Sequence, residues 1–240
     1  MKRREFLVSG AALGLMAAAG KAGAGGATER PQEGGARIAP PERGGIPVAV
    51  AISEGVTVID FAGPWEVFQD VMVPERGGDH ANQMPFELFT VSETKNVVIG
   101  SGGLRLVPDH TFESAPQPKV IVVPAQAGSK ALHAWLRKAG EKADLTMSVC
   151  TGAFQLARAG LLSGKSATTH HDFTDSLQKQ YPDIRVQRGL RFVENGRIAT
   201  AGGLTSGIDL ALRVVERYFG RPAAERTATY MEYQSRGWMV

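Results

Sequence analysis

The chain has 240 residues, of which 43% are hydrophobic and 21% are charged. This is enough to bury one full core, and the length without a leader suits one domain rather than two. The net charge of +3 could indicate nucleic-acid binding, but residues 1–24 carry all of it, with four basic side chains against one acid. The rest of the chain is close to neutral, so composition gives no support to a nucleic-acid partner.

Residues 1–24 have the order of an export signal: a basic start, an apolar stretch rich in Ala and Gly, and the small-residue site Ala22-Gly23-Ala24. Arg3-Arg4, followed by Phe6-Leu7, resembles a twin-arginine signal. We therefore expect export of the folded protein to the periplasm. An ordinary secretory signal, in which the arginines only supply positive charge, is the alternative. The apolar run is shorter than the ~20 residues that cross a bilayer, so no stable membrane anchor is expected.

Residues 25–45 are rich in Gly, Pro and charged residues without apolar periodicity, which predicts a flexible linker. The folded domain is expected to span residues 46–240. Cys150 is the only cysteine in the sequence. An intramolecular disulfide is therefore excluded, and the core must supply the stability.

The domain sequence alternates short apolar runs with amphipathic stretches. The apolar runs predict strands at 46–52, 86–91, 120–123, 145–149 and 166–169. Helical spacing predicts helices at 60–72, 129–138, 153–162, 172–181, 205–218 and 222–233. Turn residues predict hairpins at 96–106 and at 184–199, the second around Asn195-Gly196. This alternation predicts a single-domain α/β fold, a flavodoxin-like sandwich with a mostly parallel central sheet and helices on both faces.

Cys150 is placed for chemistry by this pattern, because ligands in such folds bind beyond the carboxyl ends of the strands. It lies between the strand 145–149 and the helix 153–162, where a nucleophile elbow is expected. The N–H groups of a helix N-terminus can lower a cysteine pKa from about 8.5 to below about 7.5, which predicts a reactive thiolate. The alternative is a small buried hydrophobic residue.

Four segments, in this order, resemble motifs of the ThiJ/PfpI family, a member of the class I glutamine amidotransferase-like superfamily. They are VIDFAGPWEVF (58–68), SVCTGA (148–153), ATTH (167–170) and GGLTSGID (202–209). Within the family, the likeness is greatest to isonitrile hydratases and to the sensor domains of AraC-type regulators. The chain ends soon after Gly220, so no helix-turn-helix domain is expected.

The resemblance implies that Asp60 lies beside the sulfur of Cys150 and that Thr151 helps to bind the reacting group. These three are the predicted catalytic residues. A carboxylate and a thiolate repel each other, so the pair is expected to share a proton, with Asp60 partly protonated and donating to sulfur. Asp60 would then supply a proton to a carbanion-like intermediate and act as a base for water. The alternative role for Asp60 is a helix N-cap.

The predicted substrate-binding residues are Gly63, Ala125, Gln126, Gly152 and His170. Family members usually have Pro-Gly-Gly after the strand 120–123, whereas this chain has Pro124-Ala125-Gln126. Either the backbone N–H groups there keep their direction and stabilise developing negative charge, or the Gln126 side chain offers its own amide. His170 is either a polar group of the pocket or a satisfied core residue.

We predict no metal and no cofactor. The pair His170-His171 shows no ligand spacing with the other histidines of the chain. PfpI-type proteases have a histidine directly after the nucleophile, and Thr151 stands there in this chain. The resemblance therefore favours an isonitrile hydratase-like lyase with a small-molecule substrate. Because members of the family are usually homodimers, we also expect a homodimer.

Two other functions stay open: a cysteine amidase or peptidase, and a non-catalytic envelope domain that binds a ligand or senses thiol chemistry. All three share the fold, so the fold does not decide among them.

The export signal can be tested by changing Arg3 and Arg4 to lysine together. Twin-arginine export requires the arginine pair itself rather than its charge, so we expect the precursor to remain in the cytoplasm. Cell fractionation and immunoblotting measure this. Export equal to that of the unchanged protein would contradict the twin-arginine assignment.

Overall fold

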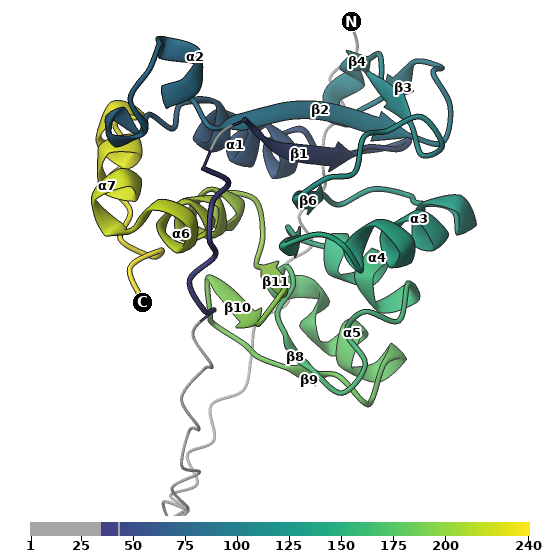
Figure 1. Ribbon diagram of the computed structural model, residues 1–240. Coiled ribbons are helices and arrows are strands. Elements are labelled where there is room, and N and C mark those ends of the chain that lie inside the picture. Colours follow the sequence, from purple (N-terminus) through teal and green to yellow (C-terminus); the bar gives the residue numbers. More distant parts are fainter. Residues whose placement is uncertain (1–34, 43) are drawn as a thin grey trace, which may run out of the picture. The chain divides into compact units, whose positions relative to one another are not determined.

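The computed structural model describes residues 35–42 and 44–240 (Figure 1). The predicted signal at 1–24 and the first part of the predicted linker lie outside the described residues. Among the residues that are described, no helix has the length and apolar character needed to cross a membrane.

A seven-stranded sheet forms the centre of the domain, with strand order β10-β11-β7-β6-β1-β2-β5. Its strands, in chain order, are β1 (Ile46–Ala51), β2 (Phe86–Ser92), β5 (His110–Thr111), β6 (Val120–Val123), β7 (Leu145–Ser148), β10 (Phe192–Asn195) and β11 (Ile198–Ala201). Only the β10–β11 pair is antiparallel. The inner strands are apolar on both faces because helices cover both sides, and β6 is buried at every position.

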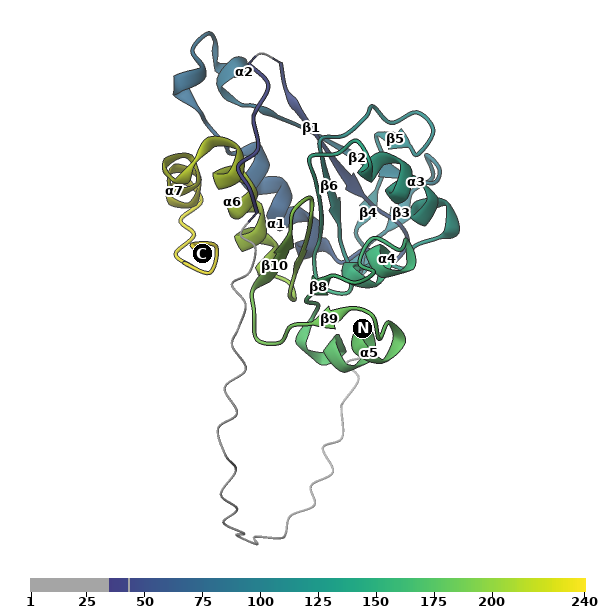
Figure 2. The ribbon, with the colours of Figure 1, turned by 60° about the horizontal axis from the view of Figure 1, so that its bottom comes forward.

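Helices pack on both faces of the sheet (Figures 1 and 2). One face is covered by α1 (Val58–Gln69) and α6 (Ser206–Phe219), and α7 (Arg221–Tyr230) packs against α6. The opposite face carries α3 (Lys130–Gly140), α4 (Gly152–Arg158) and α5 (Thr174–Gln180). Each face has its own apolar cluster, so the predicted α/β sandwich with a mostly parallel sheet is confirmed.

The remaining elements are short. The hairpin predicted at 96–106 is formed by β3 (Val98–Ile99) and β4 (Arg105–Leu106), joined by the turn η2 (Ser101–Gly103). The others are η1 (Pro74–Arg76), α2 (His80–Gln83), β8 (Ser166–Ala167), η3 (His171–Phe173) and β9 (Arg185–Val186). Segments of two to four residues carry too few positions to show a period, which is why α2 and β5 were not predicted.

Several predicted boundaries were wrong. The hairpin predicted at 184–199 is formed by β10 and β11 alone, around Asn195-Gly196. The preceding strand β9 instead pairs in parallel with β8 in a separate small sheet. The predicted helix 153–162 ends at Arg158, and Gly160 follows with a φ of 77° that does not continue a helix. Helix α1 begins two residues earlier than predicted, which places Asp60 inside its first turn.

The domain also begins earlier than the predicted start at Ile46. Ile38 donates its backbone N–H to the Arg217 carbonyl at 2.8 Å, and Arg217 Nε donates to the Ala36 carbonyl at 2.9 Å. The Gly35 N–H reaches Glu194 Oε2 at 3.3 Å. Part of the segment predicted as a linker is therefore bound to α6 and β10, through a buried ion pair between Glu194 and Arg217 that composition could not indicate.

Candidate functional site

Cys150 forms a strained turn between β7 and α4. Its φ is +56°, a conformation that non-glycine residues rarely adopt and that holds the side chain out of the sheet. The Cys150 N–H donates to the Gly202 carbonyl at 2.8 Å, and its carbonyl accepts from Thr169 Oγ1 at 2.9 Å. Two neighbouring segments thus hold the backbone of the predicted nucleophile elbow in place.

Gly152 permits this turn to approach β6. A Cβ on Gly152 would lie 2.0 Å from the Val123 carbonyl oxygen, a distance that no side chain can occupy. The Val149 N–H donates to that same oxygen at 3.0 Å. The structure therefore places Gly152, predicted as substrate-binding, at the contact between the elbow and the neighbouring strand.

Asp60 reaches the elbow from α1. The side chain is completely buried, and Oδ2 accepts the Ala125 N–H at 3.1 Å. Residue Thr57 precedes the helix without a side-chain cap, so Asp60 is not the N-cap. Among the described residues, Oδ1 has no donor with hydrogen-bond geometry. The buried carboxylate therefore does not serve as the cap at the start of the helix.

The carboxyl of Asp60 and the thiol of Cys150 interact directly. Burial raises the pKa of Asp60 to about 6. The Ala125 N–H, the Cys150 thiol and the Leu204 N–H act in the opposite direction, because they favour the charged form. Burial also raises the pKa of Cys150, with the charge of Asp60 adding to the effect, to about 11. Each group therefore alters the titration of the other.

The prediction that Cys150 rests as a thiolate with a lowered pKa was therefore wrong. The N–H groups of Thr151 and Leu204 do lower the pKa of Cys150, as a helix N-terminus was expected to. Helix α4 has only seven residues, and Cys150 is only 7% exposed. Loss of hydration and the nearby carboxylate outweigh the two N–H groups, so the pair holds one proton near neutral pH.

Leu204 is a site residue that the sequence did not reveal. Its N–H lowers the pKa of both Asp60 and Cys150, and its φ is +52°, which is unusual for a side chain of this size. The residue lies within the GGLTSGID segment, but leucine carries no polar side chain to mark it. Only its backbone contributes to the site, so no side-chain pattern could have indicated it.

Two of the amide groups expected to face a substrate after β6 are already hydrogen-bonded within the protein. The Ala125 N–H is bonded to Asp60, and Gln126 Nε2 donates to the Ala51 carbonyl at 2.9 Å. The Gln126 carbonyl accepts from the buried Gln155 side chain at 2.8 Å. Ala125 is thus brought to the site as a partner of Asp60, whereas the Gln126 side chain is turned back against β1.

Gly63 and His170 were also predicted to bind substrate, and each contacts a different part of the molecule. Gly63 lies where α1 contacts α6, and a Cβ there would be 2.8 Å from Ile208 Cγ1. His170 lies against Gly203, which leaves no room for a Cβ beside the imidazole ring. The His170 Nδ1 accepts the Asp172 N–H at 3.3 Å. His170 therefore borders the turn that carries Leu204, and Gly63 belongs to helix packing.

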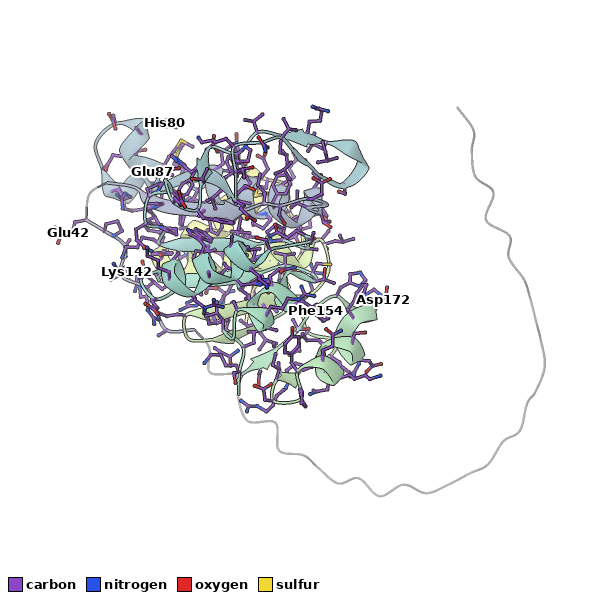
Figure 3. The ribbon with its side chains drawn as sticks, turned by 90° about the vertical axis from the view of Figure 1, so that its right-hand side faces the viewer. Glu42, His80, Glu87, Lys142, Phe154 and Asp172 are labelled. Carbon is purple, nitrogen blue, oxygen red and sulfur yellow. The ribbon has the colours of Figure 1, made fainter. Side chains whose placement is uncertain are left out.

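His170, His171 and Asp172 form a group whose possible metal-ligating atoms lie within 4.8 Å of one another. Asp172 lies at the surface at the start of η3, as Figure 3 shows, and already contacts both histidines. Exposed clusters of this kind are common, and the two histidine rings stack on each other at 4.3 Å. The structure therefore adds no reason to assign a metal here.

The profile of the DJ-1/PfpI family matches residues 47–217. The chain belongs to the DJ-1/PfpI family. It is 34% identical to an isonitrile hydratase of Pseudomonas putida over 74% of each chain. It is also 32% identical to the transcriptional regulator CdhR of Pseudomonas aeruginosa, over 58% of this chain and 44% of the regulator.

Solved structures of DJ-1/PfpI proteins share the fold. A ThiJ/PfpI family protein from Pseudomonas syringae superposes with a TM-score of 0.68 at 24% identity, covering 90% of this chain and 83% of that one. An AraC family regulator from Pseudomonas putida gives a TM-score of 0.66 at 19% identity, covering 77% of this chain and 98% of the other. These likenesses confirm the predicted sandwich fold.

Gly152→Ala tests the close contact of the elbow. The added methyl cannot fit beside the Val123 carbonyl, so we expect a loss of about 1–3 kcal/mol in the free energy of unfolding. Urea denaturation measures it. Gly140→Ala is the matched control, because a Cβ there has ordinary contact distance and alanine favours a helix. Equal stability of the two variants would contradict this account of Gly152.

Asp60→Asn tests the buried charge. The folded pKa of Asp60 is raised to about 6, so burial destabilises the ionised form above that pH, and the penalty disappears below the ordinary pKa of 3.8. The variant should match the protein at pH 4 and exceed it by up to about 3 kcal/mol at pH 8. Denaturation at several pH values measures this, with Glu93→Gln as an exposed control. A difference that does not vary with pH would refute the raised pKa.

Proposed function

We propose that the protein is a cysteine-dependent isonitrile hydratase-like enzyme that converts a small isonitrile to the N-substituted formamide. The observation that carries the proposal is the buried pair of Asp60 and Cys150, which holds a single proton beside the carboxyl ends of the parallel strands. The 34% identity to an isonitrile hydratase over 74% of each chain supports the choice of substrate class.

The pair is suited to adding a thiol across the terminal carbon of an isonitrile. In the proposed first step, Asp60 accepts the Cys150 proton as sulfur attacks that carbon, and the Asp60 carboxyl then protonates the carbon to give a thioimidate. A pKa of about 6 allows Asp60 both to accept and to return a proton near neutral pH. Transfer of the thiol proton to Asp60 removes the need for a free thiolate in the resting site.

Water completes the proposed cycle. It adds to the thioimidate carbon with Asp60 as the base, and the Asp60 carboxyl returns that proton to the nitrogen. The proton of the new hydroxyl group then passes to sulfur through Asp60 as the carbon–sulfur bond breaks and the formamide leaves. The N–H groups of Thr151 and Leu204 face the sulfur and stabilise it whenever it carries negative charge. No electrons are transferred to or from the protein, so the chemistry of these steps needs no redox group.

A ligand-binding or sensing role is a second candidate, favoured by the burial of Cys150 and by the regulator likeness. Two surface hollows have volumes of about 490 and 300 Å³. The first lies at the start of β1 and β2 and the second lies beside α7, and neither is lined by Cys150 or Asp60. A cysteine hydrolase has less support, since Thr151 follows the nucleophile and His170 Nδ1 accepts a backbone N–H.

The experiment compares the protein with its Cys150→Ala and Asp60→Asn variants on a simple isonitrile, an amide and a peptide panel. We expect formamide formation from the isonitrile alone, reduced at least about 100-fold in each variant. The rate should rise with pH through about 6, because Asp60 must be ionised to accept the thiol proton. Gas chromatography of the formamide measures it.

Isonitrile turnover that persists in Cys150→Ala would refute the proposed mechanism. If no substrate class is converted while small isonitriles raise the melting temperature of the protein but not of Cys150→Ala, the binding role replaces it. Circular dichroism of both variants establishes that a loss of turnover is not a loss of fold.

A further inference from the structure

The C-terminal segment, residues 233–238, is bound to a buried carboxylate at the start of α6. Tyr233 Oη donates to Asp209 Oδ1 at 3.2 Å, and Ser235 Oγ donates to the same oxygen at 3.1 Å. Asp209 is completely buried. Trp238 anchors the segment, since it is buried and donates from Nε1 to the Ser235 carbonyl at 3.0 Å. The family profile ends at residue 217, so this segment lies beyond the matched residues.

Asp209 in turn fixes the residue that precedes β10. Arg191 forms an ion pair with Asp209 Oδ2 through its guanidinium group. The Arg191 carbonyl accepts the Gly202 N–H at 2.9 Å, and the Gly202 carbonyl accepts the Cys150 N–H at 2.8 Å. A continuous set of hydrogen bonds therefore leads from the buried carboxylate to the backbone of the elbow.

A second route reaches the turn at residues 202–205 directly. Tyr233 Oη lies 3.4 Å from the Thr205 carbonyl, and Arg191 Nη2 donates to Thr205 Oγ1 at 3.2 Å. This turn contains Leu204, with its positive φ of 52°. A non-glycine residue in that conformation is held only where the surrounding contacts determine it. The contacts to Thr205 and Gly202, on either side of Leu204, supply that restraint.

We propose that Tyr233 and Ser235 are positioning residues, which act through Asp209 and Arg191 to hold the turn 202–205 against Cys150. They touch neither the sulfur nor the substrate. Their hydroxyl groups neutralise part of the buried charge on Asp209 and keep its carboxylate oriented toward Arg191. The inference rests on Cys150 as the reacting group of the proposed function, and it extends the site to a segment outside the family match.

The test measures the thiol itself rather than turnover. Alkylation of Cys150 by iodoacetamide is followed from pH 7 to 11 in the protein and in the double variant Tyr233→Phe, Ser235→Ala. Cys150 is the only cysteine, so the reaction reports one site. The groups that face it are Asp60 from α1 and the N–H groups of Thr151 and Leu204. Because no isonitrile is used, the result is independent of the proposed activity.

We expect the double variant to react at least about threefold more slowly at pH 8, with its pH profile displaced upward, because an N–H that no longer faces the thiolate stops favouring it. Tyr230→Phe is the control, since Tyr230 is 74% exposed on α7 and loses the same hydroxyl without contact to Asp209. Its profile should match that of the unchanged protein.

A double variant with a lower melting temperature but an unchanged or faster alkylation profile would show that the segment is only structural, and would overturn the proposal. An equal slowing in Tyr230→Phe would do the same. Should the double variant fail to fold, the single Tyr233→Phe variant keeps the ring and the Ser235 bond, and its profile decides between the same two outcomes.

Discussion

The burial of one negative charge between Asp60 and Cys150 is the constraint on which the site depends. Neither group can ionise freely away from water, so the proton that they share determines the resting state. The N–H groups of Ala125, Thr151 and Leu204 make the arrangement tolerable, because they supply backbone dipoles where solvent is excluded. A cysteine near a helix N-terminus is therefore not by itself a thiolate, and its neighbours decide the balance.

The surrounding backbone can be understood as the means of bringing these groups together. The parallel strands β1, β6 and β7 end at one edge of the sheet, so α1 and the elbow begin side by side. Cys150 and Leu204 both have positive φ values, and the Leu204 N–H favours the charged forms of Asp60 and Cys150. Such strain persists only where the surrounding contacts fix the conformation. The tight approach at Gly152 and the contacts of Asp209 both help to hold this strained backbone.

Much of this was accessible from the sequence because it depends on local pattern. The apolar run of β6 and the helical spacing of α6 predicted elements that the structure confirms. The position of Cys150 between a strand and a helix predicted the elbow. The early start of the domain at Gly35 and the pairing of β9 with β8 were missed, because both depend on partners distant in the sequence. Short segments with no period gave no signal of their own.

The sequence by itself indicated the α/β fold and the family, because strand–helix alternation and motif order are written along the chain, and the resemblance to that family implied that Asp60 lies beside Cys150. Only the tertiary structure decided the protonation of that pair, the use of the Ala125 amide by Asp60, and the contribution of Leu204. The physical reason is that burial and the direction of a backbone N–H are properties of packed neighbours, and no residue type encodes them.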